Sequence, residues 1–304
     1  RTEANDALSI ILEGEADPVQ IGALLVALQY RGINANELAG MVEAARRNCS
    51  PQAFPDSRAV LDWPVYRSPR NGTPPWFLLS AKLIADAGHR VVLHGFGASA
   101  GTWHSALAEF EILTCPTLEE ARQDLAARGI VFIPLAAIDP QMAALLSLYR
   151  LFEMRSPLSQ VIQLLNPLAA THSFVGVPSR AARTLQRDAA EILGFKNFAA
   201  ITSSRDLAQA TPFRLTEFLL IADGKHHPSS IPPRSATQPR NQGTGFGAVE
   251  ICLGLWRGSV RDADAMEIVV ATAAYALIAL SGGAKNYDEA HTEASRMWSE
   301  RKTR

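Results

Sequence analysis

We predict an α/β protein with two domains: a small N-terminal helical bundle and a larger domain in which helices cover a mostly parallel sheet. Two patterns predict this class. Residues 1–50 show helical periodicity and helix-capping signals, whereas from Asp62 onward short apolar runs alternate with helical segments. The chain has 304 residues, 47% of them hydrophobic, which is enough for one large and one small domain. We expect residues 1–57 to form the helical domain and residues 58–304 the α/β domain.

The helical domain is predicted from local signals. Apolar residues recur at helical spacing from Ala7 to Leu12. Two capping boxes follow, Asp17 to Gln20 and Asn34 to Glu37, and each predicts the start of a helix. A connector rich in Pro and Ser then separates this bundle from the rest of the chain.

The larger domain is predicted from five short apolar runs that are candidate strands of a mostly parallel sheet: Val91–Leu93, Ile130–Ile133, Phe174–Val177, Ala199–Ile201 and Leu219–Ala222. A helix with a capping box is expected from Thr117 to Arg128. Residues 141–165 are typical of helix alone, and we expect them to pack back onto the N-terminal bundle. Residues 226–247 are rich in Pro, Ser, Arg and Gly and predict a long loop. Two helices should follow, one over 264–280 and one capped by Asn286.

The stretch from Leu61 to Glu109 carries the candidate site. We expect a loop, and then a helix that Thr73 caps, that has Pro74 and Pro75 in its first turn and that ends at Gly88. The strand Val91–Leu93 leads into His94 and Gly95, at the end of a strand where open α/β sheets bind their ligands. An arginine-rich loop with Arg67 and Arg70 and a glycine-rich loop with Gly97 should meet at this edge.

Composition narrows the class of protein. The formal net charge is −1, from 29 Lys and Arg against 30 Asp and Glu, which disfavours a general nucleic-acid binder. The three cysteines, Cys49, Cys115 and Cys252, lack metal-binding spacing and are typical of reduced intracellular thiols. The apolar segment Met266–Leu280 is too short to span a bilayer, and no signal peptide is visible. We expect a soluble, cytoplasmic protein.

With these elements placed, the chain resembles the anthranilate phosphoribosyltransferase and pyrimidine nucleoside phosphorylase superfamily. The resemblance lies in residues 11–46, 61–95 and 155–167. In particular, the chain is similar to the divergent glycosyl transferase branch of that superfamily. The resemblance implies the two-domain fold, pentosyl transfer from a phosphorylated sugar, Mg²⁺, and a homodimer formed through the helical domain. For that dimer the apolar candidates are Leu24, Leu25 and Leu28.

Several family motifs are replaced in this chain. Where the parent enzymes have a GTGGD loop that holds pyrophosphate, this chain has Val65–Pro69, without glycine. Pro75–Leu78 stands at the place of the parent NxST motif. After His-Gly the parent enzymes have Asn-Arg-Ser, whereas this chain has Phe96–Ala98. The acidic pair for magnesium is reduced to Asp206, a single candidate metal ligand. Standard anthranilate phosphoribosyltransferase activity is therefore not expected.

Other family positions are retained. In the parent enzymes the residues matching His94 and Arg155 help hold the aromatic acceptor, so these two are the candidate catalytic residues. The candidate ligand- and phosphate-binding residues are Arg67, Arg70, Thr73, Gly95, Gly97 and Asn166, with the guanidinium groups replacing the glycine loop. Structural roles remain open: a fold-stabilising histidine for His94 and an ion pair for Arg155.

Two hypotheses follow for the function. The first is a glycosyl (pentosyl) transferase-like protein that binds a phosphorylated sugar or nucleotide-like ligand in the interdomain cleft. The second is a non-catalytic nucleic-acid-binding protein, like the YbiB-like branch of the family, which would use one helix face with Arg180, Arg183 and Arg187. Two weaker signals carry no assignment. We interpret the glycines of 243–247 as a flexible loop, and the adjacent His226 and His227 as solvated.

Overall fold

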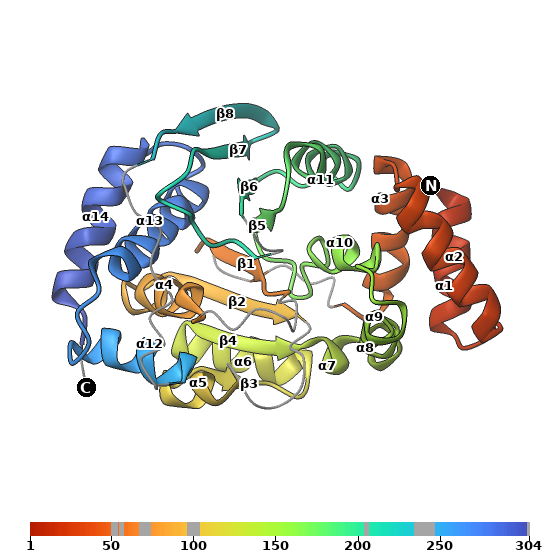
Figure 1. Ribbon diagram of the computed structural model, residues 1–304, viewed down its shortest axis with the longest axis horizontal. Coiled ribbons are helices and arrows are strands. Elements are labelled where there is room, and N and C mark those ends of the chain that lie inside the picture. Colours follow the sequence, from red (N-terminus) through yellow and green to blue (C-terminus); the bar gives the residue numbers. More distant parts are fainter. Residues whose placement is uncertain are drawn as a thin grey trace.

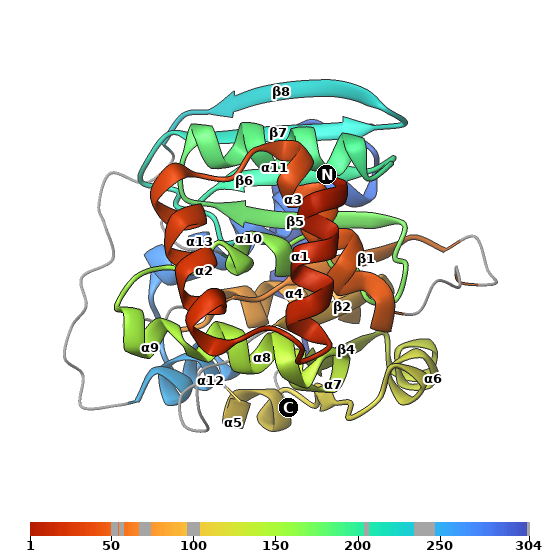
Figure 2. The same ribbon diagram turned by 90° about the vertical axis from the view of Figure 1, so that its right-hand side faces the viewer.

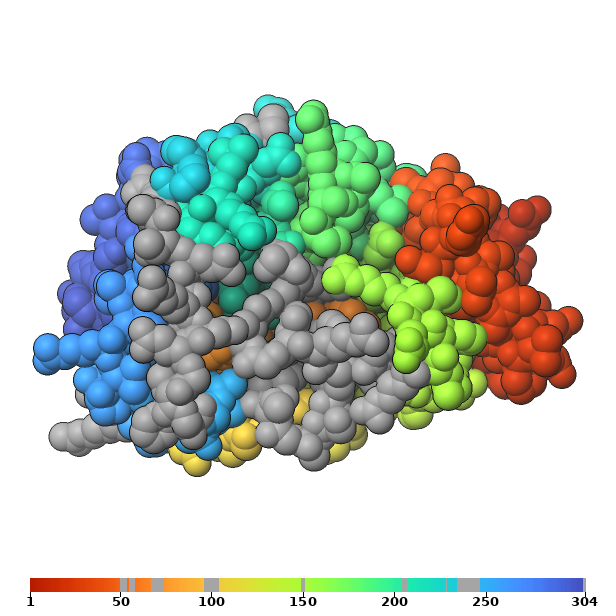
Figure 3. Space-filling model, in the orientation of Figure 1, coloured from red at the N-terminus to blue at the C-terminus, as the bar shows by residue number. Residues whose placement is uncertain are grey.

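The computed structural model describes residues 1–49, 54, 58–66, 74–95, 104–203, 207–233 and 247–302. The molecule is elongated, with the N-terminal helices at one end and the C-terminal helix at the other (Figures 1 and 3). A central sheet lies between them, with helices on both faces (Figure 1). The predicted fold class is therefore confirmed.

Three helices open the chain: α1 (Thr2–Leu12), α2 (Pro18–Arg31) and α3 (Ala35–Ala45), followed by the 3₁₀ turn η1 (Arg46–Asn48). Both predicted capping boxes are present. The Asp17 side chain accepts a hydrogen bond from Val19 N, and Asn34 accepts one from Glu37 N. Figure 2 shows α1 and α2 in front of the rest of the molecule, with α3 behind them.

The sheet has the order β3-β4-β2-β1-β5-β6-β7-β8. Neighbouring strands from β3 to β6 are parallel, and β7 and β8 are antiparallel additions at one edge. The strand bounds are β1 Val60–Pro64, β2 Arg90–Gly95, β3 Leu113–Thr114, β4 Ile130–Pro134, β5 His172–Val177, β6 Phe198–Thr202, β7 Thr216–Ala222 and β8 Lys225–Ile231.

All five predicted strands are present, but the sequence analysis missed three others. Residues 60–64 were expected to be loop, yet they form the central strand β1, which pairs in register with β2 from Val60 and Arg90 onward. The short β3 was also missed. The predicted loop 226–247 is wrong at its start, because residues 225–231 pair with β7 as β8. Our prediction for 234–246, including Gly243 and Gly245, lies outside the described residues, whereas Gly247 is the N-cap residue of helix Ala248–Arg257.

The remaining helices are α4 Trp76–Asp86, α5 His104–Glu109, α6 Leu118–Arg128, α7 Leu135–Ile138, α8 Pro140–Ser147, α9 Tyr149–Phe152, α10 Leu158–Ile162, α11 Arg180–Ile192, α12 Ala248–Arg257, α13 Ala263–Leu280 and α14 Tyr287–Glu300. α4 begins later than predicted: Pro75 is its N-cap residue, without a side-chain cap, and Thr73 lies outside the described residues. The capping box of Asn286 with Glu289 is confirmed.

Two apolar cores cover the faces of the sheet. One contains the buried side chains of α4, α5, α12, α13 and α14. The other joins α6, α8, α10 and α11 to all three N-terminal helices. Within the segment 141–165, α10 packs on α3 of the N-terminal bundle (Figure 2). The bundle and the sheet therefore share one continuous core.

α13 is the one helix in the described part of the chain that is long and apolar enough to cross a membrane. However, 78% of it is buried inside the protein, and it packs between the sheet and α14 in Figure 1. Its apolar composition is that of a core helix.

Candidate functional site

The carboxyl ends of the parallel strands meet at one edge of the sheet, on the side of α7 to α10 and the N-terminal helices (Figure 1). The chain crosses from β1 to β2 in one direction and later returns to β5 on the other side of β1. Such a switch point is where open α/β sheets bind ligands. Val65 and Leu207 form an antiparallel bridge at this edge. The described residues that flank Arg67 and Asp206 in the sequence therefore lie side by side.

Asp62 and His94 meet on neighbouring strands, below this edge. Both side chains are fully buried, and His94 Nε2 lies 3.0 Å from Asp62 Oδ1. The contact is short but poorly aligned, since neither atom makes a hydrogen bond of normal geometry. Asp62 also accepts a long bond of 3.5 Å from Ser173 Oγ on β5. The pair links the three central strands, which supports the fold-stabilising alternative for His94.

Gly95 is explained by its backbone surroundings. It has φ +149°, and a Cβ at this position would lie 2.6 Å from Val65 O. Val65 N in turn donates to His94 O at 2.7 Å. Only glycine allows β1 and β2 to approach this closely at the edge. This structural requirement accounts for Gly95 without a ligand.

Asn166 is engaged in a turn. It has φ +44°, its Nδ2 donates to Ala170 O at 2.9 Å, and its Oδ1 accepts from Ala170 N at 2.7 Å. The amide therefore stabilises the backbone after α10. The same segment is tied to α3 by Arg46, whose guanidinium donates to Leu164 O and Leu165 O. The predicted role of Asn166 in binding a ligand stays a prediction.

Arg155 lines a cavity of about 190 Å³ where the helical bundle meets the α/β part. α2 contributes Gln29, the end of β5 contributes Val177, and α11 contributes Ala182. The full lining is Gln29, Arg155, Ser156, Ser159, Gln160, Gln163, Val177, Pro178, Ala182 and Gln186. This places Arg155 at a concave surface of the described residues.

Three glutamines of this lining form a buried network that the sequence analysis missed. Gln163 Nε2 donates to Gly176 O at 3.1 Å. Gln186 Nε2 donates to Gln163 Oε1 at 3.2 Å and to Gln160 O at 3.0 Å. Gln186 is 1% exposed and Gln163 3%. A signal was present, because Gln160 and Gln163 stand among the apolar residues Leu158, Val161, Ile162, Leu164 and Leu165 in the segment that resembles the family.

The arginine face proposed for nucleic acid is largely paired with carboxylates. Arg183 donates to Glu217 at 2.8 Å and to Thr202 Oγ1 at 3.1 Å. Arg187 pairs with Asp188 at 2.6 Å. Arg180 is exposed on the first turn of α11. Two of the three guanidinium groups are thus held by intramolecular contacts.

The residues predicted to bind the anion and the metal ion are not among the described residues. Arg67, Arg70, Thr73, Gly97 and Asp206 lie outside the described residues. Within the described ranges, no group of three or more His, Cys, Asp or Glu side chains could hold a metal ion. Asp62, the described carboxylate at this edge, is occupied by His94. A role for Mg²⁺ therefore rests on Asp206.

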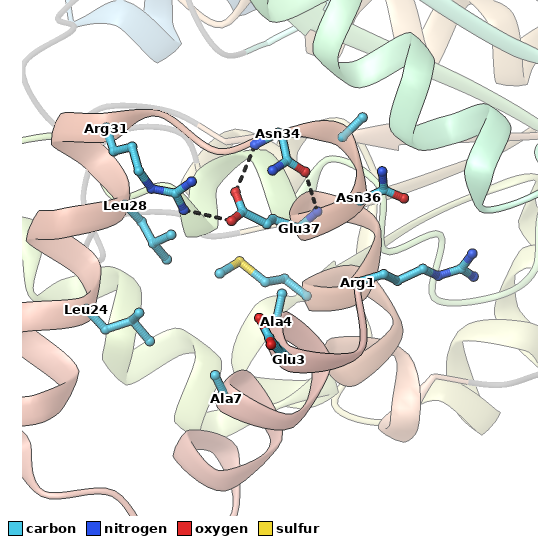
Figure 4. A pocket seen from close by; sticks show the side chains of 12 residues that line it. Arg1, Glu3, Ala4, Ala7, Leu24, Leu28, Arg31, Asn34, Asn36 and Glu37 are labelled. Atoms are coloured by element: carbon cyan, nitrogen blue, oxygen red, sulfur yellow. Dashed lines mark hydrogen bonds and ion pairs between the residues drawn. The ribbon is translucent and has the colours of Figure 1, made fainter.

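A larger hollow of about 680 Å³ lies within the N-terminal bundle, among α1, α2 and α3. Figure 4 shows Leu24 and Leu28 pointing into it, with the Arg31–Glu37 ion pair at its rim. It is distant from the sheet edge and is not our candidate site. Leu25 and Leu28 are only 3% and 6% exposed. They belong to the interior of the chain, so our choice of these two as dimer contacts was wrong.

Comparison with known proteins supports the fold and the family. Residues 1–49 match the helical bundle domain of the glycosyl transferase family. The anthranilate phosphoribosyltransferase of Desulfitobacterium hafniense (strain Y51) is 29% identical over 225 residues, which are 73% of this chain and 66% of that enzyme, just under two thirds of its length. Anthranilate phosphoribosyltransferase 2 of Streptomyces coelicolor is 30% identical over 232 residues, or 73% of this chain and 67% of that enzyme.

Solved structures share the architecture along nearly the whole chain. The anthranilate phosphoribosyltransferase of Thermus thermophilus superposes with a TM-score of 0.75 at 20% identity, covering 98% of this chain and 93% of that one. The Saccharomyces cerevisiae enzyme in complex with PRPP and Mg gives a TM-score of 0.76 at 17% identity, covering 97% and 88%. Together with the Streptomyces relative, this fold shows that the chain belongs to the anthranilate phosphoribosyltransferase family within the glycosyl transferase superfamily.

Proposed function

We propose that this protein is a pentosyl transferase-type protein that binds a phosphorylated sugar in the cleft between its helical bundle (residues 1–57) and its α/β domain (residues 58–304). The observation that carries the proposal is the cavity at the carboxyl end of β5, which Arg155 lines at the position of a family acceptor residue. A second observation also supports the proposal: this cavity lies near the switch point between β1 and β5, where open α/β sheets bind ligands. The yeast relative, solved with PRPP and Mg, indicates the class of donor.

The anion would be held by a different route from that of the parent enzymes. Val65–Pro69 replaces the glycine loop, and its Arg67, with Arg70, supplies guanidinium groups that can bind phosphate through paired N–H donors. Asp206 is the residue that would hold Mg²⁺, whose chemistry is charge neutralisation between phosphate groups. Arg155 would face the second substrate.

The reaction that such a site supports is substitution at the anomeric carbon. The bond from that carbon to the leaving phosphate oxygen breaks, the oxygen keeps the electron pair, and the acceptor forms the new bond. Positioning and stabilisation of the leaving charge are what the protein contributes. Standard anthranilate phosphoribosyltransferase activity is not part of the proposal, because the parent phosphate motifs are replaced.

The test is a thermal-shift and calorimetric titration with PRPP and with pyrophosphate, each with and without Mg²⁺. A ligand that binds only the folded state raises its stability. We expect PRPP to stabilise the protein, and the Arg67→Ala/Arg70→Ala double variant to lose this effect. Arg296→Ala, in an exposed ion pair on α14, is the matched control. No stabilisation by any sugar phosphate would overturn the proposal.

Nucleic-acid binding is the alternative, and short DNA belongs in the same titration. We do not favour it, because Arg183 and Arg187 are paired with Glu217 and Asp188. Stabilisation by DNA alone, weakened by Arg180→Glu and by salt, would reverse this preference. We further propose a soluble, cytoplasmic homodimer formed through the helical bundle, with contacts on the exposed face of α2.

A further inference from the structure

The start of α4 is the place where a sheet of this kind is expected to bind phosphate. β1 lies at the switch point of the sheet, between β2 and β5, and α4 is the next helix that the structure describes after β1. In open α/β folds the helix after such a strand binds phosphate at its N-terminus, through backbone N–H groups that have no partner within the helix. Unpaired N–H groups at the start of α4 would therefore indicate a phosphate site.

The N–H groups at the start of α4 are paired within the chain instead. The N-cap residue, Pro75, has no N–H. Trp76 N and Leu78 N donate to the backbone oxygens of the two preceding prolines, at 3.0 Å in each case. Phe77 N donates to the side-chain oxygen Oε1 of Gln209 at 3.2 Å. In this described turn, each N–H group that a helix leaves unpaired at its start therefore has a partner from the protein.

Gln209 reaches α4 from a distant part of the chain. It belongs to the segment after β6, 132 residues away from the N–H group that it caps, and it is 9% exposed. Leu207 of the same segment forms the bridge to Val65. On the other side, Ala210 N donates to the buried Oγ1 of Thr272 at 2.9 Å. The tertiary fold therefore holds the Gln209 amide against α4.

β5 makes room for this segment at Gly176. A Cβ at that position would lie 2.0 Å from the carbonyl carbon of Leu207 and 2.4 Å from Ala208 N. Real Cβ atoms do not approach backbone atoms this closely, so only glycine allows the two backbones to pack here. Because the segment is packed so tightly on β5, Gln209 stays at α4 unless the segment itself moves.

The side chains at the start of α4 also disfavour a phosphate. Trp76, Phe77 and Leu78 are 7%, 1% and 0% exposed, so a charged group at this helix end would lose much of its contact with water. Burying a charge costs far more free energy than burying a neutral, hydrogen-bonded amide. The oxygen of Gln209 therefore satisfies Phe77 N where a phosphate oxygen would be poorly solvated.

We infer that Gln209 is a specificity-determining residue that closes the end of α4 to phosphate. Its oxygen takes the place on Phe77 N that a phosphate oxygen would take in an open helix end. The inference rests on the proposed function, for which it excludes one way of holding the phosphorylated ligand. A phosphate that binds to this protein is then held by side chains, without the backbone N–H groups at the start of α4.

The first test uses the unchanged protein and NMR spectroscopy, with selective ¹⁵N labelling of phenylalanine. Titration with pyrophosphate and with PRPP should leave the amide resonance of Phe77 at its position. Phe198, which is 0% exposed at the start of β6, is the reference for changes that spread through the whole fold. A resonance of Phe77 that moves with the ligand, while that of Phe198 does not, would place the ligand at the helix end and overturn the inference.

Two variants separate opening of the helix end from loss of the cap. Gln209→Ala removes the capping oxygen and clears the space beside Phe77 N, whereas Gln209→Met removes the oxygen at similar volume. Both should lower the thermal midpoint of the free protein. Only Gln209→Ala should bind pyrophosphate more tightly than the unchanged protein does, by at least about fivefold in calorimetric titration, because a charged acceptor can then pair with the freed N–H group.

The other outcomes of this comparison contradict the inference. A Gln209→Ala protein that is less stable but binds pyrophosphate no more tightly would make Gln209 a structural cap only. An equal gain of affinity in Gln209→Ala and Gln209→Met would show that the covering side chain does not exclude the anion.

Asn286→Ala is the control for loss of a cap elsewhere. Asn286 accepts a hydrogen bond from Glu289 N at 3.0 Å, at the start of α14. The variant should also lower the thermal midpoint. However, the first turn of α14 carries Asp288 and Glu289, which repel an anion, so its affinity for pyrophosphate should stay that of the unchanged protein. A gain as large as that of Gln209→Ala would mean that any uncapped helix binds pyrophosphate, and would remove the special role of Gln209.

The two proposals fail separately. Binding of PRPP to the unchanged protein with a shifted Phe77 resonance would keep the proposed function and remove this inference. Absence of PRPP binding to the unchanged protein, together with a gain of pyrophosphate affinity in Gln209→Ala, would keep this inference and remove the proposed function.

Discussion

The Asp62 carboxylate lies 3.0 Å from His94 Nε2, and both side chains are completely buried between β1 and β2. Removing one member of a buried pair leaves the other without compensation. Since Ser173 Oγ offers Asp62 only a bond of 3.5 Å, no strong substitute contact is available among the described residues. Each of the two buried side chains therefore has the other as its nearest polar neighbour, and we expect the fold to depend on this contact.

We accordingly expect Asp62→Asn to lower the free energy of unfolding by about 3 kcal/mol, as measured by urea denaturation. The control is Asp86→Asn on α4, which loses only a partly exposed pair with Lys82 and should change stability by about 0.5 kcal/mol or less. A loss for Asp62→Asn no larger than that of the control would mean that the contact contributes little. His94 would then return as a candidate for chemistry.

Gly95→Ala is expected to destabilise the protein by at least about 2 kcal/mol, because the new Cβ would meet Val65 O at 2.6 Å in a backbone conformation with φ +149°. Gly14→Ala is the control: it also has positive φ, +79°, but open space around the Cβ, and should cost about 1 kcal/mol. Thermal denaturation of both variants gives the comparison. Equal losses would show that the close approach at the sheet edge relaxes easily.

The parts of the fold that were predicted correctly are those with local causes. The capping boxes of Asp17 and Asn34 need only residues three positions away, so the sequence contains the whole signal. β1 was missed because Asp62 and Pro64 interrupt its apolar run, and what makes a buried Asp62 tolerable is His94 from another strand. β8 was missed because its exposed, polar residues form a strand only by pairing with β7.

The site shows the same division. Arg155 could be chosen from the sequence, because it stands in a segment that resembles a family motif. The network of Gln163 and Gln186 could not, since the two residues lie 23 positions apart and meet only after α10 packs against α11. The network is a tertiary property with no sequence motif.

Three histidines, His89, His104 and His172, have pKa values that burial lowers from the ordinary value of 6.5. At a pH just below 6.5, the unfolded chain therefore binds more protons than the folded protein. Stability is fully present above pH 6.5 and falls as the pH drops through the lowered pKa values. Urea denaturation at about pH 7.5 and about pH 5.5 should show this loss. His172→Gln should reduce it, whereas Gln123→Met, on the exposed face of α6, should not; equal pH dependence in both variants would refute the assignment.

The surface of α2 leads to the last prediction. Buried Leu25 and Leu28 face the interior, yet the opposite face exposes Val19 at 79%, Val26 at 42% and Tyr30 at 96%. A helix that is apolar on both faces is normally covered on both. In a closed dimer the same face meets itself across a two-fold axis, which suits a single exposed stripe with a terminal tyrosine.

We expect sedimentation velocity to find a dimer. In the Val26→Asp/Tyr30→Asp variant the dissociation constant of the dimer should rise about 30-fold or more, because a tyrosine anchor is lost and two charges are introduced into the interface. The fold should persist, since both side chains are exposed in the single chain. Gln123→Asp on α6 is the control for an added surface charge far from α2. A protein that is monomeric at every concentration would overturn the dimer, and a dimer that the double variant leaves intact would move its interface away from α2.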